Sequence, residues 1–270
     1  MSSWTLRAPR KRDLSAFSTV SDPVNEIIYP PVPLPPVVHP SYVTHDMPSN
    51  YLAEIANPDS DVCIRAFSLI DAEITFIIPT MNRPTLSRTL ASLYQQSNPK
   101  WKAIVLFDRC EPTEDITDTR ILHLSIHSAP SPGRAGHLRN IGMLMVTTPW
   151  IGFVDDDDVL LPHYVRAVLE ESSLMPQAAL ISFRMIEEGR VIPPPFCQTI
   201  LPNQIGISFA IKSSLVKEGF LFTAAEREDY HYVKAVKQAK KFIILSSAIT
   251  YLVRNAAYQE HPEIVRMVLR

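Results

Sequence analysis

Residues 150–158 read WIGFVDDDD, an apolar run that ends in four consecutive aspartates, Asp155 to Asp158. The apolar half has the composition of a buried strand, and ligands bind at the carboxyl ends of strands in open α/β sheets. Four carboxylates crowded at such a point repel one another, so the arrangement needs a cation. Carboxylate oxygens suit Mg²⁺ or Mn²⁺, ions that also bridge to substrate phosphates. The run therefore predicts a metal and phosphate site at the mouth of a sheet.

Two other interpretations of the acidic run stay open. The first is a solvated acidic turn in which Asp158 caps the helix that follows. The second is a phosphatase site, because an apolar strand followed by Asp-x-Asp-x-Val resembles the way haloacid-dehalogenase-type phosphatases present a nucleophilic aspartate, here Asp155, and its acid partner, here Asp157. A long patterned stretch precedes the run, whereas that nucleophile normally comes early in its domain. The sequence after the run also offers no convincing second acidic pair.

The organisation around the run is that of an α/β protein. From Glu73 onward, short apolar runs alternate with amphipathic stretches, which predicts a mainly parallel sheet flanked by helices. The expected strands are 74–79, 103–107, 121–125, 150–154, 179–183 and 242–246. The expected helices are 85–96, 134–145, 162–173 and 225–240.

The first 70 residues have a different composition. Residues 29–36 read YPPVPLPP, which favours extended polyproline geometry and a role as a linker or strap. A ligand for a proline-recognition domain is the alternative. We expect a Pro-rich segment over 1–70, the catalytic domain over 71–256 and a tail over 257–270.

Composition and charge narrow the class of protein. The chain has 270 residues, of which 46% are hydrophobic and 20% charged, as in a soluble globular protein. A formal net charge of -2 offers no basic field for nucleic acid. The three cysteines, Cys63, Cys110 and Cys197, are widely spaced and odd in number, which favours a reducing compartment. No apolar run approaches the ~20 residues of a membrane span. The expected location is cytoplasmic, with peripheral membrane contact left open.

The motifs taken together resemble a known family. Residues 74–84, ITFIIPTMNRP, form an apolar strand that enters a polar loop, and they resemble the first motif of family 2 glycosyltransferases, whose nucleotide-binding fold is the GT-A type. The resemblance continues in order along the chain to residue 254, and it leaves the first 70 residues uncovered. It includes 101–108 (WKAIVLFD), 136–142 (GHLRNIG), the Asp-x-Asp run with Pro162, 206–212 (GISFAIK) and 228–230 (EDY).

The resemblance implies a nucleotide-sugar donor and a divalent metal. Asp157 is the implied direct ligand of Mn²⁺ or Mg²⁺, with Asp155 shared between metal and ribose, and Arg139 lies near the diphosphate or supports the acidic run. A plain salt bridge on a helix surface is the other interpretation of Arg139. The remaining implied donor contacts are Pro79, Thr80, Asn82, Arg83, Asp108 and Asp156. An aspartate suits the imide N–H of uracil or thymine, so Asp108 makes a UDP- or dTDP-sugar the expected donor.

The implied general base is Asp229, with Glu228 as the alternative, acting on a hydroxyl of a glycan or another acceptor. In-line attack then predicts inversion at the anomeric carbon. The second acid that the family often has after Asp108 is missing here, since Arg109 follows. The helix after Asp229 carries lysines where the family commonly has arginine. A histidine in the metal shell (His137, His231 or His261) and a non-catalytic nucleotide-sugar-binding protein both stay open.

Overall fold

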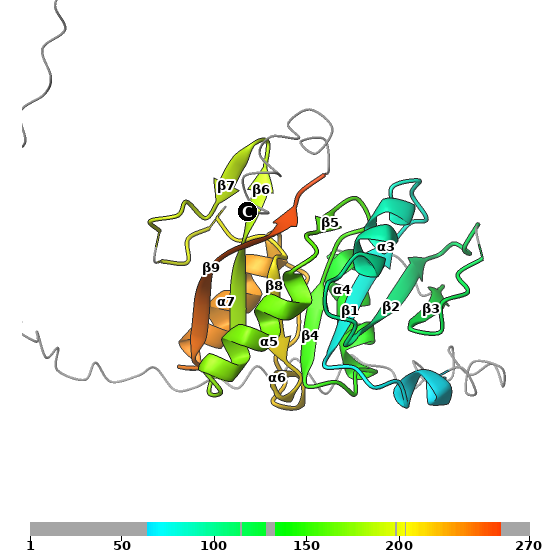
Figure 1. The fold of residues 1–270 in the computed structure, drawn as a ribbon, viewed down its shortest axis with the longest axis horizontal. Helices are drawn as coiled ribbons and strands as arrows, with labels where there is room; N and C mark the ends of the chain where they lie inside the picture. Colours follow the sequence, from blue (N-terminus) through cyan, green and yellow to red (C-terminus); the bar gives the residue numbers. More distant parts are fainter. Residues whose placement is uncertain (1–63, 114, 128–132, 198, 203, 255–270) are drawn as a thin grey trace, which may run out of the picture. The chain divides into compact units, whose positions relative to one another are not determined.

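The computed structural model describes residues 64–113, 115–127, 133–197, 199–202 and 204–254. Within this part of the chain the strands form one sheet in the order β3-β2-β1-β4-β8-β6-β9-β5, with β7 paired to β6 (Figure 1). The strands are β1 (Ile74–Thr80), β2 (Trp101–Asp108), β3 (Ile121–Ile126), β4 (Trp150–Phe153), β5 (Val159–Leu160), β6 (Leu180–Glu187), β7 (Arg190–Ile192), β8 (Phe209–Lys212) and β9 (Ile243–Leu252). The helices are α3 (Leu86–Tyr94), α4 (Arg134–Leu144), α5 (Tyr164–Leu174), α6 (Ser214–Lys217) and α7 (Glu228–Gln238).

One half of the sheet, β3-β2-β1-β4, is entirely parallel. Every residue of β1, β2 and β4 is buried, because α3 and α5 lie in front of the sheet and α4 and α7 lie behind it (Figure 1). The strand order reverses at β1, which has β2 on one side and β4 on the other. The carboxyl ends of these strands therefore meet at a topological switch point, where α/β proteins bind ligands.

Helix α4 packs very closely on β1 and β2. A Cβ added to Gly142 would lie 2.7 Å from Ile77 Cγ2 and 3.1 Å from Leu106 Cδ1. A residue without a side chain therefore lets the helix approach the sheet, which draws the first turns of α4 over the carboxyl ends of β1 and β2.

The other half of the sheet is mixed. Strand β8 is antiparallel to both β4 and β6, whereas β9 is parallel to β6 and antiparallel to the short β5. The pairing of β6 with β9 shifts register between Ser182 and Met185. Because β5 directly follows the acidic run, its pairing with β9 brings the end of β9 back to the four aspartates.

The α/β fold expected from the sequence is confirmed, with the parallel arrangement confined largely to one half. Each expected strand and helix is present with ends shifted by a few residues, except that the strand expected at 242–246 continues to Leu252. Strands β5 and β7 and helix α6 were not expected. The Pro-rich stretch and the tail over 257–270 lie outside the described residues. No helix among those described has the length and apolarity needed to cross a bilayer.

Candidate active site

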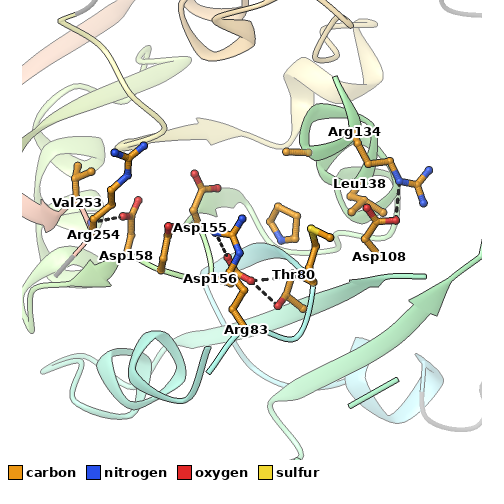
Figure 2. A pocket seen from close by; sticks show the side chains of 14 residues that line it. Thr80, Arg83, Asp108, Arg134, Leu138, Asp155, Asp156, Asp158, Val253 and Arg254 are labelled. Carbon is orange, nitrogen blue, oxygen red and sulfur yellow. Dashed lines mark hydrogen bonds and ion pairs between the residues drawn. The ribbon is translucent and has the colours of Figure 1, made fainter. Parts of the chain in front are cut away.

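A pocket of about 380 Å³ opens at the carboxyl ends of the parallel strands (Figure 2). Its walls are the loop after β1, the end of β2, the first turns of α4, the acidic run and the residues that follow β9. Among the residues expected from the sequence, it is lined by Pro79, Thr80, Arg83, Asp108, Asp155, Asp156 and Asp157. The chain segments that bear these side chains are far apart in sequence, and the sheet brings them to one cavity.

The four aspartates of the run alternate between two environments. Asp156 and Asp158 are each 5% exposed. The side chains of Asp155 and Asp157 are 38% and 30% exposed. Buried carboxylates need partners within the protein, whereas Asp155 and Asp157, although each pairs with an arginine, keep part of their surface open to the pocket.

Asp156 holds the loop that follows β1. Its Oδ2 accepts hydrogen bonds from Thr80 Oγ1 at 2.7 Å and from the Met81 N–H at 3.4 Å. Arg83 Nη1 lies 3.5 Å from Asp156 Oδ1 and 3.2 Å from Asp157 Oδ2. Asn82 adopts a positive φ of 59°, and its N–H donates to Thr80 Oγ1 at 2.9 Å. Asn82 therefore shapes the loop and does not line the pocket.

Asp158 connects the acidic run to the end of β9. Its Oδ2 accepts from the Tyr251 hydroxyl at 2.7 Å and its Oδ1 accepts from the Arg254 N–H at 2.6 Å. The same hydroxyl accepts from the Asp155 N–H at 3.2 Å. Burial, with a further contribution from the charge of Asp155, raises the pKa of Asp158 to about 7.

Asp108 ends β2 at the far wall of the pocket and is 7% exposed. Its Oδ1 accepts from Arg134 Nε at 2.9 Å and from Arg109 Nε at 3.0 Å. Arg134 is the first residue of α4 and was not among the residues predicted for the site, although it stands two residues before the Gly136 motif. Where a second acid would follow Asp108, the chain has Arg109 at a positive φ of 56°.

Arg139 of α4 joins the acidic run to α7. It is 4% exposed and donates to Asp155 Oδ1 through Nη2 and to Glu228 Oε1 through Nη1. The guanidinium also lies over the ring of Phe222, 5.5 Å from its centroid. Burial alone would lower the pKa of Arg139, but the charges of Asp155 and Glu228 outweigh that effect and raise it. Arg139 is thus a buried ion-pair partner rather than a surface salt bridge.

Two neighbours of Arg139 fix the start of α7. Asn140 Nδ2 donates to the Phe222 carbonyl at 2.9 Å, and the Phe222 N–H donates to Asn140 Oδ1 at 2.8 Å. A Cβ on Gly136 would lie 3.2 Å from Glu228 Cδ, so glycine leaves room for that side chain. The Gly-x-x-Arg-Asn-x-Gly pattern is therefore explained by contacts with α7 and the sheet.

Asp229 follows Glu228 in the first turn of α7. Its Oδ1 accepts from the Tyr230 N–H at 2.7 Å. Burial raises the pKa of Asp229, and the charge of Asp155 adds to the effect. Burial likewise raises the pKa of Glu228, which is already paired with Arg139. Of the two acids, Asp229 is the one without an ion-pair partner among the described residues.

The residues of the run fit a divalent cation that is held partly by substrate. Among the described residues no group of three or more His, Cys, Asp and Glu side chains is arranged to hold a metal. Asp155 and Asp157 offer two partly exposed carboxylates at the pocket, and Mg²⁺ characteristically uses one or two carboxylates together with phosphates and water. His137 and His231 do not line the pocket, and His261 lies outside the described residues.

Comparison with known proteins gives matches in both sequence and fold. Residues 75–200 match the family model described as glycosyl transferase family 2. A Haemophilus influenzae protein named as an uncharacterized glycosyltransferase is 26% identical over 186 residues, which is 63% of this chain. The aligned region is also 63% of that protein, so the chain spans less than two thirds of the length of this relative.

Similar solved structures include TarS from S. aureus, with a TM-score of 0.56, 18% identity and coverage of 73% of this chain and 39% of TarS. The structure of TarS 1–349 in complex with UDP-GlcNAc has a TM-score of 0.53 and 17% identity, over 73% of this chain and 65% of that one. The mannosyltransferase PcManGT from Pyrobaculum calidifontis, in complex with GDP-Man and Mn²⁺, has a TM-score of 0.51 and 13% identity, over 80% of this chain and 71% of that one.

At such identities the structural matches establish the shared fold alone. The family match adds the region that holds β1, β2, the α4 motif and the acidic run. Over residues 75–200 the chain therefore matches glycosyl transferase family 2, and its fold is the GT-A fold of the similar solved structures.

Proposed function

We propose that this protein transfers a sugar from a UDP- or dTDP-sugar to a hydroxyl of a glycan or another acceptor, with a divalent metal and with inversion. The observation that carries the proposal is the placement of two partly exposed carboxylates, Asp155 and Asp157, at the carboxyl-end pocket of the parallel strands. The solved relatives named above hold UDP-GlcNAc in one case and GDP-Man with Mn²⁺ in another, which supports a nucleotide-sugar donor.

The nucleoside is proposed to bind between the loop after β1 and the end of β2. Asp108 lines the pocket there, and its carboxylate can accept a hydrogen bond from the imide N–H of uracil or thymine. Thr80 and Asp156 hold the loop in place through their 2.7 Å hydrogen bond. Arg134 holds the Asp108 carboxylate at the pocket wall. The nucleobase of the donor would therefore meet a hydrogen-bond acceptor that is already in position.

Asp157, together with Asp155, would hold Mn²⁺ or Mg²⁺ at the pocket. The chemistry supplied there is neutralisation of the negative charge that develops on the departing diphosphate. The partial exposure of both carboxylates suits a site completed by substrate oxygens and water.

Asp229 is proposed as the general base. Its carboxylate takes the proton of the acceptor hydroxyl while the hydroxyl oxygen forms a bond to the anomeric carbon, and the electron pair of the breaking C–O bond leaves with the diphosphate. A carboxylate whose pKa is raised by burial is a better proton acceptor than an ordinary one. Glu228 is paired with Arg139 and is proposed to position α7 rather than to take the proton.

The test is nucleoside diphosphate release. The protein is incubated with UDP-GlcNAc, UDP-glucose, dTDP-rhamnose or GDP-mannose, with MnCl₂ or with EDTA, and free nucleoside diphosphate is measured. We expect slow, metal-dependent release from one uridine or thymidine donor, and we expect Asp157→Ala to abolish it. Asp71→Ala is the matched control. Asp71 precedes β1, at the end of the strand opposite the pocket, and its side chain is 80% exposed.

The outcomes separate the candidate functions. Absence of release from every donor, with tight binding of a nucleotide sugar, would identify a non-catalytic binding protein. Phosphate release from p-nitrophenyl phosphate that Asp155→Ala abolishes would identify the phosphatase activity that the acidic run also resembles. Release from GDP-mannose alone would overturn the assignment of Asp108 to a uracil or thymine base.

A further inference from the structure

Arg254 lies at the pocket, and its guanidinium forms no ion pair with a described residue. It stands two residues after the end of β9, lines the cavity and is an exposed residue. Figure 2 shows it at one end of the acidic run, next to Asp158, to which its main-chain N–H is bonded. Within the described part of the chain, no carboxylate lies within ion-pair distance of the Arg254 guanidinium.

The other arginines near the pocket are already neutralised. Arg83 pairs with Asp156 and Asp157, and Arg134 pairs with Asp108. Arg139 is buried between the carboxylates of Asp155 and Glu228 and does not line the pocket. A diphosphate entering the cavity gains little from cations whose charge is already balanced by aspartates. Among the described residues that line the pocket, Arg254 is the cation whose charge is not balanced in this way.

The main chain of Arg254 is held although its side chain is not. Strand β9 pairs with β5 through Leu252 and Tyr251, which fixes the strand two residues before Arg254. The buried Asp158 carboxylate then accepts the Arg254 N–H at 2.6 Å and the Tyr251 hydroxyl at 2.7 Å. Arg254 has a positive φ of 50°, so the chain turns at this residue, immediately beyond the strand. Asp158 thereby fixes the main chain of Arg254 and so limits the positions that its guanidinium can occupy.

We infer that Arg254 binds the diphosphate of the nucleotide-sugar donor from the side of β9, opposite the nucleoside wall at Asp108. This inference rests on the proposed function and adds to it a phosphate-binding residue outside the region that matches the family model, which ends at residue 200. The planar guanidinium can donate two parallel hydrogen bonds to phosphate oxygens, which suits a diphosphate better than a sugar or a base.

The experiment compares a ligand that has the diphosphate with one that lacks it. UDP, dTDP and GDP are titrated into the full-length wild-type protein in MnCl₂ by calorimetry, and the tightest binder becomes the probe. Its free nucleoside, followed by ligand-observed NMR, reports on the base and ribose contacts alone. The same two titrations are made on Arg254→Ala, Arg254→Lys and the control Arg166→Ala, whose arginine is exposed on α5 and pairs with Glu170. Thermal melting checks that each variant is folded.

We expect Arg254→Ala to weaken binding of the diphosphate by roughly 10- to 100-fold, as for loss of hydrogen bonds to a charged group. Binding of the nucleoside should not change, Arg254→Lys should lose less than Arg254→Ala, and Arg166→Ala should match the wild type. Equal diphosphate binding by the wild type and Arg254→Ala would overturn this inference and leave the proposed function standing. Equal weakening of both ligands would also overturn it, because that is the result of a purely structural role. A wild-type protein that binds none of the three diphosphates would overturn both proposals.

Discussion

The two halves of the sheet contribute to the site in different ways. The parallel half offers carboxylates that are nearly all engaged, such as Asp156 with Thr80 and Asp108 with Arg134. The mixed half, with α7, contributes Asp229 and Arg254, whose side chains have no ion-pair partner among the described residues. This difference fits the proposal that the donor binds in a preformed pocket and that Asp229 and Arg254 form their polar contacts only when substrates bind. Arg139 is a direct ionic link between the two, since it pairs with Asp155 on one side and Glu228 on the other.

The largest expected effect is a loss of turnover on substitution of Asp229, the proposed general base, which lies in α7 beside the mixed half. Asp229→Asn keeps the shape of the side chain but removes its ability to accept a proton, and loss of a general base lowers the rate by about 10²- to 10⁴-fold. Turnover with the active donor and acceptor measures the change. Donor affinity should stay within twofold of the wild type, because Asp229 does not line the pocket proposed for the donor. A large loss of donor affinity with unchanged turnover at saturation would place Asp229 on the donor side instead.

The pH dependence of the rate sharpens the same assignment. Burial raises the pKa of Asp229 above its ordinary value of 3.8, and a general base works only when it is deprotonated. The turnover number should therefore fall as pH decreases through this raised pKa, by about tenfold per pH unit below it. Glu228→Gln should keep this acid limb, whereas Asp229→Asn should lose it. An acid limb that disappears in Glu228→Gln would identify Glu228 as the base.

The next largest expected effect is a loss of stability when Arg139, which pairs with Asp155 and Glu228, is replaced. Arg139→Met keeps much of the side-chain volume but leaves Glu228 and Asp155 without their buried cation. Removing one partner of a buried ion pair costs about 3 kcal/mol in the free energy of unfolding, which urea denaturation measures. Replacing Glu228 by Gln in the same variant should recover part of the loss, because one unpaired charge is then gone. If Arg139→Met alone is as stable as the wild type, the ion pairs of Arg139 do not contribute to the free energy of unfolding.

A smaller effect is expected where β9 joins the acidic run. Tyr251→Phe removes the hydroxyl that donates to Asp158 and accepts from the Asp155 N–H. Loss of a hydrogen bond to a buried charged group should lower the free energy of unfolding by about 2 kcal/mol. Urea denaturation above pH 8 is the measurement, because burial raises the pKa of Asp158 to about 7 and the carboxylate must be ionised for the full effect. A smaller loss at pH 6 than at pH 8.5 would support this explanation, and equal losses would contradict it.

Much of the parallel half could be predicted from the sequence because its signals are local. The apolar runs of β1, β2 and β4 are buried along their whole length, so each reads as a strand without knowledge of its neighbours. The acidic run and the Gly136 to Gly142 pattern are likewise short, contiguous segments. Their placement at one pocket follows from the parallel arrangement of the strands.

The contributions of the mixed half depend on pairings between distant segments. Strand β5 has two residues, Val159 and Leu160, and no periodic pattern can identify so short a strand. The alternation of buried and exposed aspartates requires Tyr251 and the Arg254 N–H to reach Asp158 across more than 90 residues. The strand expected at 242–246 was too short, because β9 continues to Leu252 through a register shift against β6. Arg254 could not be found without that longer strand.

The smallest expected effect is that of Gly142→Ala, which tests how tightly α4 packs on the parallel half. The sign of the change in the free energy of unfolding decides the result. Gly142→Ala places a methyl group 2.7 Å from Ile77 Cγ2 and 3.0 Å from Ile77 Cδ1, which forces the helix or the strand to shift. Overpacking of this kind typically costs about 2 kcal/mol, while replacing a helical glycine by alanine stabilises the helix by about 1 kcal/mol. The net expectation is a loss of about 1 kcal/mol in the free energy of unfolding, measured by urea denaturation. A gain would show that α4 can move away from β1 without penalty. In that case the donor pocket would be as adjustable as the mixed half, and the contrast between the two halves would not hold.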